Sequence, residues 1–279
     1  MPNRTTSSSG YAPVRGGELY YETAGLGRAV VLIHAGVADC TMWDDQFEEF
    51  ARQYHAIRYD VRGYGRSRSE SVTFSYQQDL VDLLDYLKVE KATLVGVSRG
   101  GMIAIDTTIE HPGRVEALIP VASGVGGLPR VPDDSHKAQT EAEMFARMEV
   151  LWEKGQLEEL NELEVRMWVD GPGQPEGRAA ASVRQRVLRM NYQDLTHPDE
   201  RTTVQELEPP AAGRLGEIHV PTLVIVGDLD TTRILASAEA LAQGIPGARK
   251  VVFPGTAHML SMEQPGEFNR VVLEFLVKL

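Results

Sequence analysis

The chain has a single cysteine, no long apolar run and few basic residues for its length of 279 residues. Because Cys40 has no second cysteine to pair with, an internal disulfide is excluded, and no cluster of thiols can hold a zinc ion. No apolar run approaches the roughly 20 residues of a membrane-spanning helix, so we expect no membrane partner. Residues 1–10 are polar and rich in serine and threonine. We expect them to form a frayed tail rather than a signal peptide, and the protein to be cytoplasmic.

Basic residues are outnumbered by acidic ones, 28 against 40, which gives a formal net charge of −12 at pH 7. Proteins that bind nucleic acids or anionic membranes normally present a basic face, so this balance argues against both partners. The chain is long enough for one large α/β domain, or for a core domain that carries an insertion. We expect a monomer or a homodimer that acts on a small molecule.

Short apolar segments alternate with helical patterns over the first part of the chain. Residues 19–23, after a Gly-Gly turn, favour an antiparallel edge strand. Leucines at helical spacing mark residues 75–87 as a helix. Strands that alternate with helices through short loops predict a parallel sheet covered on both faces. The apolar runs of strand length are residues 29–33, 56–59, 92–97 and 115–121.

The alternation is interrupted between about residues 125 and 213. Two stretches rich in glycine and proline bound this segment, and inside it apolar residues recur only at helical spacing. Strand patterns resume afterwards, at 222–226 and 249–253. We therefore predict an α/β core domain of residues 1–124 and 214–279, with an all-helical cap inserted at 125–213.

A Gly-x-Ser-x-Gly pentapeptide centred on Ser98 follows one of the apolar runs, and a helical pattern begins directly after it. Strand, sharp turn and helix are the context in which this motif forms a nucleophile elbow. The turn presents the serine above the sheet, and a Cβ atom at Gly96 or Gly100 would crowd it. The backbone N–H of Arg99 then points toward the negative charge that develops on a substrate. The alternative is a turn of small residues that packs a helix against a sheet.

A serine nucleophile needs a base and an acid that orients the base. In a parallel sheet such groups lie at the carboxyl ends of strands. Asp228 and Asp230 follow the strand pattern at 222–226, and His258 follows the one at 249–253. The order serine, acid, histidine is the one that this architecture uses. His258 is the predicted base and Asp230 the favoured acid, with Asp228 as the residue that braces the turn.

Five ordered motifs extend this pattern over the chain. They are His34-Ala35-Gly36 with Trp43, Asp60-x-Arg62-Gly63-x-Gly65-x-Ser67, Gly96-Val97-Ser98-Arg99-Gly100-Gly101, Val220-Pro221-Thr222-Leu223 with Gly227-x-x-Asp230, and Gly255-x-x-His258 with Glu263, Pro265 and Phe268. In these motifs the sequence resembles the α/β-hydrolase superfamily, specifically its capped branch of carboxylesterases, lactonases and carbon–carbon bond hydrolases. The resemblance implies a mostly parallel eight-stranded sheet flanked by helices, with Ser98 as nucleophile, Asp230 as acid and His258 as base.

The sequence departs from the family pattern at two positions. His34-Ala35 stands where the family has His-Gly, so Gly36 is the expected second donor to the oxyanion, with Val37 as the alternative. His34 is expected to brace its own loop. Arg99 follows the nucleophile, where a small residue or methionine is commoner. Its guanidinium either binds a substrate carboxylate or forms a salt bridge with the cap, and the salt bridge is the favoured interpretation.

Methionine and tryptophan residues recur at helical spacing in the cap, where such residues usually belong to a core. Because one face of a cap lies over the active site and methionine accommodates varied apolar ligands, we expect a mostly apolar acyl pocket. The predicted lining residues are Val37, Met102, Met144, Met148, Trp152, Trp168 and Met259.

These residues predict a serine hydrolase that cleaves carboxylic esters, lactones included, through an acyl-enzyme. The N–H groups of Gly36 and Arg99 would hold the oxyanion, and no metal or organic cofactor is needed. Two alternatives remain on the same fold: a hydrolase of a carbon–carbon bond in a dicarbonyl ring-cleavage product, and a small-molecule receptor of low turnover. The serine at position 98 argues against the epoxide hydrolase and haloalkane dehalogenase branches, which place an aspartate there.

Overall fold

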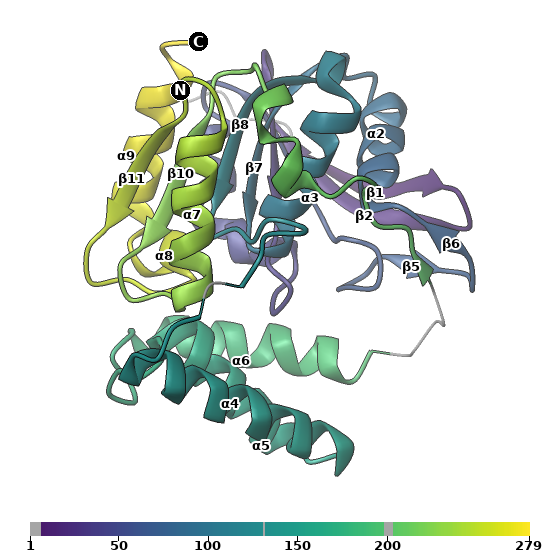
Figure 1. Cartoon of the computed structure of the whole chain (residues 1–279). Helices are drawn as coiled ribbons and strands as arrows, with labels where there is room; N and C mark the ends of the chain where they lie inside the picture. Colours follow the sequence, from purple (N-terminus) through teal and green to yellow (C-terminus); the bar gives the residue numbers. More distant parts are fainter. Residues whose placement is uncertain (1–6, 131, 198–202) are drawn as a thin grey trace.

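A central β-sheet with helices on both faces forms the larger part of the molecule, and three further helices lie together at one end of it (Figure 1). The computed structural model describes residues 7–130, 132–197 and 203–279. No helix in this described part is long and apolar enough to cross a membrane.

The described residues form a nine-stranded sheet in the order β1-β2-β4-β3-β7-β8-β10-β11, with β5 beside β2. The β1–β2 hairpin and the β2–β4 pair are antiparallel, and the strands from β4 to β11 pair in parallel. The prediction of a mostly parallel sheet with eight strands in its path is confirmed, and β5 adds a short ninth strand. The strands are β1 (Ser7–Val14), β2 (Gly17–Ala24), β3 (Ala29–Ile33), β4 (His55–Tyr59), β5 (Arg68–Ser69), β7 (Ala92–Val97), β8 (Val115–Val121), β10 (Leu223–Gly227) and β11 (Arg249–Phe253).

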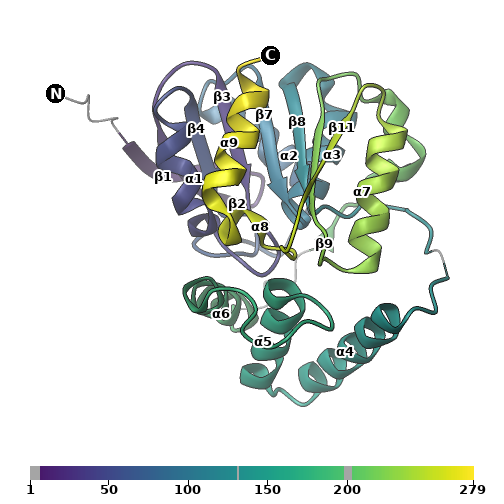
Figure 2. The same cartoon turned by 90° about the vertical axis from the view of Figure 1, so that its left-hand side faces the viewer.

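The two faces of the sheet are covered by different helices. Figure 2 shows α1 and α9 on one face and α3 and α7 on the other. Every residue of the central strands β3 and β7 is buried, which explains their continuous apolar sequences. The helices of the core are α1 (Asp44–Phe50), α2 (Tyr76–Tyr86), α3 (Arg99–Glu110), α7 (Thr232–Gly244), α8 (Leu260–Glu263) and α9 (Pro265–Leu276). Short 3₁₀ helices lie at Cys40–Trp43, Pro112–Arg114, Ala211–Gly213 and Leu215–Glu217.

The helices at the end of the sheet come between β8 and β10 in the chain. They are α4 (His136–Glu153), α5 (Leu157–Val165) and α6 (Ala181–Leu195), and a π-helical turn at Arg166–Asp170 follows α5 directly. We call residues 132–197 the helical insertion. After it, β9 (Thr203–Val204) pairs in parallel with β6 (Thr73–Phe74) in a small second sheet.

The N-terminal segment corrects one expectation from the sequence. Residues 7–10 were expected to belong to a frayed tail, but they begin β1, which pairs with β2 from Ser7 opposite Ala24 to Val14 opposite Gly17. The segment Ser7–Gly10 has no large apolar side chain and lies at the edge of the sheet, so it carries no periodic signal. Its strand conformation comes from backbone pairing with β2. Residues 1–6 of the same expectation lie outside the described residues.

Candidate active site

Ser98 lies in the turn between β7 and α3, with φ 55° and ψ −112°. A positive φ costs a non-glycine residue on the order of 1–3 kcal/mol, so the surroundings must hold this conformation. A Cβ at Gly96 would lie 2.1 Å from the carbonyl oxygen of Gly100, and a Cβ at Gly100 would lie 2.3 Å from that of Ile33. The Ser98 N–H donates to the carbonyl of Val121 at 2.9 Å. The turn thus has the strained conformation of a nucleophile elbow, and the glycines give it the space that it needs.

Asp230 and His258 meet at the carboxyl ends of the neighbouring strands β10 and β11. His258 Nδ1 lies 2.8 Å from Oδ2 and 3.1 Å from Oδ1 of Asp230, and the two residues are only 2% and 1% exposed. The Thr231 N–H also donates to Asp230 Oδ1, at 2.7 Å. A carboxylate accepts the proton of Nδ1, so the neutral imidazole presents Nε2 as its free acceptor. This pair has the geometry of an acid that orients a base.

Asp228 braces the turn after β10, the role expected for it from the sequence. Its Oδ1 accepts the N–H of Gly255 at 2.7 Å and so joins the loops after β10 and β11. The side chain is exposed, whereas Asp230 is buried against His258. The geometry therefore favours Asp230 over Asp228 as the partner of the histidine.

The hydroxyl of Ser98 forms no hydrogen bond with any residue in the described part of the chain. Hydrogen bonds between a nucleophile and its base often tighten only when substrate is bound. The structure thus orients His258 through Asp230 and presents Ser98 at the same end of the sheet.

His34 holds the loop that follows β3. The Val61 N–H donates to His34 Nε2 at 2.9 Å, so Nδ1 carries the proton and donates to the Ala35 carbonyl at 2.8 Å. Burial lowers the pKa of His34, which keeps the ring neutral. The expected bracing role of His34 is confirmed. In the described residues the N–H groups of both Gly36 and Val37 donate no hydrogen bond, so both remain available to an oxyanion.

The Arg99 side chain lies between two tyrosines and α6. Its guanidinium carbon is 5.6 Å from the centroid of the Tyr64 ring and 5.9 Å from that of Tyr76. The guanidinium forms no ion pair with any described carboxylate, so the favoured prediction of a salt bridge to the cap is wrong for this part of the chain. Asp194 of α6 attracts the charge without contacting it. Although partial burial opposes the charge, Tyr64, Tyr76 and Asp194 raise the pKa of Arg99 above its usual value.

Three of the predicted pocket residues lie near these groups. The Trp168 ring, in the π-helical turn, is 4.7 Å from the His258 ring between centroids, at an angle of 43°. Val37 is half-buried in the loop after β3. Met102 is also half-buried, and its Sδ would lie 3.3 Å from a Cβ at Gly124.

The other four pocket residues lie elsewhere. Met259 is fully buried in the main core, and Met148, which is 8% exposed, packs in a cluster of α4 and α5, so both contact other side chains rather than an open pocket in this conformation. Met144 is half-buried against the same cluster, and Trp152 is 58% exposed on α4. The assignment of Met148 and Met259 to the pocket is thereby corrected. Helical spacing shows that such residues share a face, but not which surface covers that face.

Helix α4 is joined to the loop of Asp230 by two polar contacts. Lys137 Nζ donates to the backbone carbonyl of Asp230. The Glu141 carboxylate accepts the Thr232 N–H at 2.9 Å and the Thr232 hydroxyl at 2.7 Å. A cavity of about 860 Å³ lies beside this contact, between α4 and α7, and its walls include Leu128, Glu141, Phe145, Trp168, Thr231 and Arg233. The cavity therefore contacts Thr231, which follows Asp230 in the chain, and Trp168, whose ring lies against His258.

Arg178 joins the helical insertion to the loop of His258. Its guanidinium donates to the carbonyls of Val169 and Asp170 at 2.7 and 2.6 Å, to the Gly255 carbonyl at 2.6 Å, and to Glu263 Oε2 at 2.5 Å. No motif in the sequence indicates this role, because the partners of Arg178 lie in distant segments.

Residues 28–265 match a family model described as the alpha/beta hydrolase fold. The chain belongs to the α/β hydrolase family. Among its relatives, a 2-hydroxy-6-oxo-6-phenylhexa-2,4-dienoate hydrolase of Comamonas testosteroni is 29% identical over 276 residues, with 92% of this chain and 91% of the relative covered. The 3-oxoadipate enol-lactonase 1 of Acinetobacter baylyi is 25% identical over 253 residues, with 89% and 88% covered.

A solved structure of Est816, described as an N-acyl homoserine lactone degrading enzyme, is also similar to this α/β hydrolase. It is 27% identical with a TM-score of 0.69, and the match covers 95% of this chain and 100% of that one. The names of these relatives differ in the substrate: one is a dienoate hydrolase, one an enol-lactonase and one a lactone degrading enzyme. Together they support a hydrolase and leave its substrate to be argued from the site.

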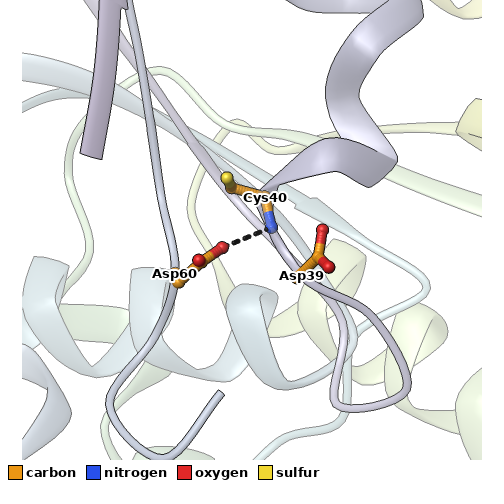
Figure 3. A group of neighbouring side chains, drawn as sticks. All are labelled: Asp39, Cys40 and Asp60. Carbon is orange, nitrogen blue, oxygen red and sulfur yellow. Dashed lines mark hydrogen bonds between the residues drawn. The ribbon is translucent and has the colours of Figure 1, made fainter. Parts of the chain in front are cut away.

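This α/β hydrolase also brings Asp39, Cys40 and Asp60 together, with potential ligand atoms within 4.8 Å of one another (Figure 3). The two Asp60 oxygens accept the N–H groups of Cys40 and Arg66, both at 2.8 Å. Asp39 Oδ1 accepts both the N–H and the hydroxyl of Thr41. Burial raises the pKa of the Cys40 thiol, which stays protonated and is a poor metal ligand. This network serves the loop between β3 and α1.

Proposed function

We propose that this α/β hydrolase cleaves carboxylic esters, lactones included, with Ser98 as nucleophile. The buried hydrogen bond between His258 and Asp230 is the observation that carries the proposal. It lies at the same end of the parallel sheet as the strained turn of Ser98, because β7, β10 and β11 all end there. An oriented base at the same sheet edge as a presented hydroxyl supports acyl transfer, which requires both groups.

In the proposed reaction His258 Nε2 takes the proton of Ser98 as Oγ attacks the ester carbonyl. The carbonyl oxygen becomes an oxyanion, and the N–H groups of Arg99 and Gly36 donate to it. One such donor contributes on the order of 3 kcal/mol in comparable sites. The bond to the leaving oxygen then breaks, and the alcohol departs with the proton from His258. A water molecule that gives its proton to His258 attacks the acyl group and releases the acid and free Ser98.

Asp230 and Trp168 support the histidine in this reaction. The Asp230 carboxylate fixes the tautomer and stabilises the imidazolium that forms when His258 takes the proton. The Trp168 ring covers part of the imidazole, at 4.7 Å between centroids. Since His258 is 2% exposed, the charge separation takes place away from bulk water, where electrostatic interactions are stronger.

The cavity between α4 and α7 gives room for a medium-sized substrate group. Its volume of about 860 Å³ lies within the range of small-molecule sites. Leu128, Phe145 and Trp168 provide apolar walls, and the Trp168 ring also contacts the His258 ring. This supports a preference for substrates with an apolar group of several carbons over acetate esters.

A second candidate is the hydrolysis of a carbon–carbon bond next to a carbonyl. It is favoured by the dienoate hydrolase relatives, one of them 29% identical over 92% of this chain. The same serine, histidine and aspartate would serve, with a carbanion as the leaving group in place of an alkoxide. A panel of p-nitrophenyl esters, lactones and a 2-hydroxy-6-oxo-dienoate distinguishes the two, because turnover of the dienoate alone favours carbon–carbon bond hydrolysis.

The nucleophile is tested by labelling and by substitution. A fluorescent phosphonate probe should label the wild type at Ser98, and Ser98→Ala should abolish both the label and the hydrolysis of p-nitrophenyl butyrate. Ser182→Ala, at an exposed position of α6, is the matched control and should retain both. Full hydrolysis by folded Ser98→Ala would refute the proposal.

A further inference from the structure

We propose that the Arg99 side chain is a binding subsite for a carboxylate of the substrate, so the substrate class is an ester or lactone that carries a free carboxylate. The inference rests on the proposed function, since it places the carboxylate next to the carbonyl that Ser98 attacks. It concerns the side chain of Arg99, whereas the proposed reaction uses its backbone N–H. Three observations support the subsite: the position of the Arg99 guanidinium, its accessibility, and its lack of an ion pair in the described part of the chain.

The guanidinium lies next to Gly36. A Cβ at Gly36 would lie 3.2 Å from Arg99 Nε and 3.6 Å from the Tyr64 hydroxyl, so the Arg99 side chain runs directly past this glycine. Gly36 and Arg99 are the two expected oxyanion donors. The cationic group therefore lies beside the place where the scissile carbonyl would bind.

The guanidinium is accessible but not fully hydrated. Arg99 is exposed, yet enough protein surrounds the group for burial to oppose its charge. An arginine on an open surface would be screened by water, and an enclosed one could not meet a ligand. A positive charge that is both accessible and partly desolvated therefore binds an anion more strongly than a fully hydrated or a fully enclosed one.

The guanidinium also lacks a carboxylate partner of the kind that the more buried Arg62 and Arg178 have. Arg62 donates two hydrogen bonds to Asp79, at 2.7 and 2.8 Å, and Arg178 donates to Glu263. Arg99 forms no ion pair in the described part of the chain. The Tyr64 and Tyr76 hydroxyls occupy part of its fork of N–H donors, and the remaining donors can bind a carboxylate.

The groups that face Arg99 favour an anion over a second cation. The hydroxyls of Tyr64 and Tyr76 lie close enough to interact with the guanidinium and can donate to a carboxylate. Asp194 of α6 is the facing carboxylate, and burial raises its pKa to about 7. Below neutral pH it is therefore largely protonated and does not compete with the substrate for the charge of Arg99.

The test compares two substrates that differ only in charge: the p-nitrophenyl hemi-ester of glutaric acid and its methyl ester. Wild type should prefer the hemi-ester. Arg99→Met should lower kcat/KM for the hemi-ester about 10- to 100-fold more than for the methyl ester, mainly through KM, because the contact exists before and during the reaction. Arg99→Lys should retain part of the preference. The matched control is Arg189→Met at an exposed position of α6, which should change neither value.

Two outcomes would overturn the subsite: equal kcat/KM values for the two esters in wild type, or an equal loss for both in Arg99→Met. Calorimetric binding of monomethyl glutarate to Ser98→Ala gives an independent readout, with weaker binding expected in Ser98→Ala/Arg99→Met. If the protein cleaves neither ester, the proposed function fails while this measurement still decides the subsite. If it cleaves both without regard to charge and binds no monomethyl glutarate, the subsite alone fails.

Discussion

At the scale of single residues, Asp228 and Asp230 lie two positions apart and meet different partners. Asp230 is buried and accepts the proton of His258 Nδ1, whereas exposed Asp228 accepts the N–H of Gly255. We expect Asp230→Asn to lower kcat about 10⁴-fold, because an amide that donates to Nδ1 stabilises the wrong tautomer. Asp228→Asn retains an acceptor oxygen and should keep kcat within about twofold. Steady-state hydrolysis of p-nitrophenyl butyrate measures both, and similar losses in the two variants would contradict the assignment.

Asp194 provides a pH test of the same site. Its pKa is raised to about 7 by burial, and the facing groups are Arg99, which lowers it, and Glu164 of α5, which raises it. As the pH rises through about 7, Asp194 gains a negative charge that competes for Arg99. The ratio of kcat/KM for the hemi-ester to that for the methyl ester should therefore fall between pH 6 and 8, while pH effects on the reaction that are common to both esters cancel in the ratio.

Asp194→Asn removes this titration and should make the ratio nearly independent of pH. The control is Glu162→Gln, an exposed carboxyl of α5 outside the site. A ratio that falls with pH equally in wild type and Asp194→Asn would show that another group is responsible.

At the scale of secondary structure elements, Arg178 holds the segment after the π-helical turn against the loop of His258. Its side chain is 16% exposed and that of Glu263 is 6% exposed. Arg178→Met would leave Glu263 buried without its cation, a loss of about 3–5 kcal/mol for a buried pair, at the lower end here because some exposure remains. We expect a lower melting temperature and a lower kcat, since Glu263 also accepts the N–H of Ala257, next to His258.

The control for Arg178 is Arg166→Met, whose ion pair with Glu176 is 4.0 Å long and exposed. That variant should change the free energy of unfolding by less than about 0.5 kcal/mol. Glu263→Gln in the Arg178→Met background should recover part of the stability, because it removes the unpaired charge. No recovery would mean that Arg178 acts through its backbone acceptors rather than through Glu263.

The elements that the sequence predicted well are those with local signals. The strands β3 and β7 are continuous apolar runs because both faces of the sheet are covered, and the glycines around Ser98 mark its turn. Residues 7–10 were missed because their strand depends on pairing with β2 alone. Arg178 was missed because its partners lie up to 85 positions away in the chain. The burial of Met148 and Met259 was missed for the same reason, because the side chains that cover them belong to other segments of the chain.

At the scale of the whole molecule, apolar packing divides the helical insertion. Val183, Val187 and Met190 of α6 belong to the main hydrophobic cluster together with the sheet. Helix α4 instead packs its Met148 and Leu151 in a small separate cluster with Leu160 and Met167. Helix α5 takes part in both clusters, because Val165 at its end belongs to the main one, and Asn191 of α6 donates to Asn161 and Glu164 of α5. We infer that α5 and α6 form the fixed wall of the site and that α4 is held more weakly, mainly by polar contacts such as those of Lys137 and Glu141.

Native-state hydrogen exchange tests this division. Amides of α4 should open at a lower free energy than those of α5, α6 and β7, because fewer buried apolar contacts must be broken. Met167→Ala removes part of the small cluster at a cost of about 2–5 kcal/mol. It should speed exchange most in α4 and leave β7 unchanged. Leu32→Ala in β3 is the matched core variant and should speed exchange in all four elements. Equal protection of α4, α5 and α6 in wild type would show that the insertion opens as one unit, and substrate entry would then require movement of α6, which carries Asp194.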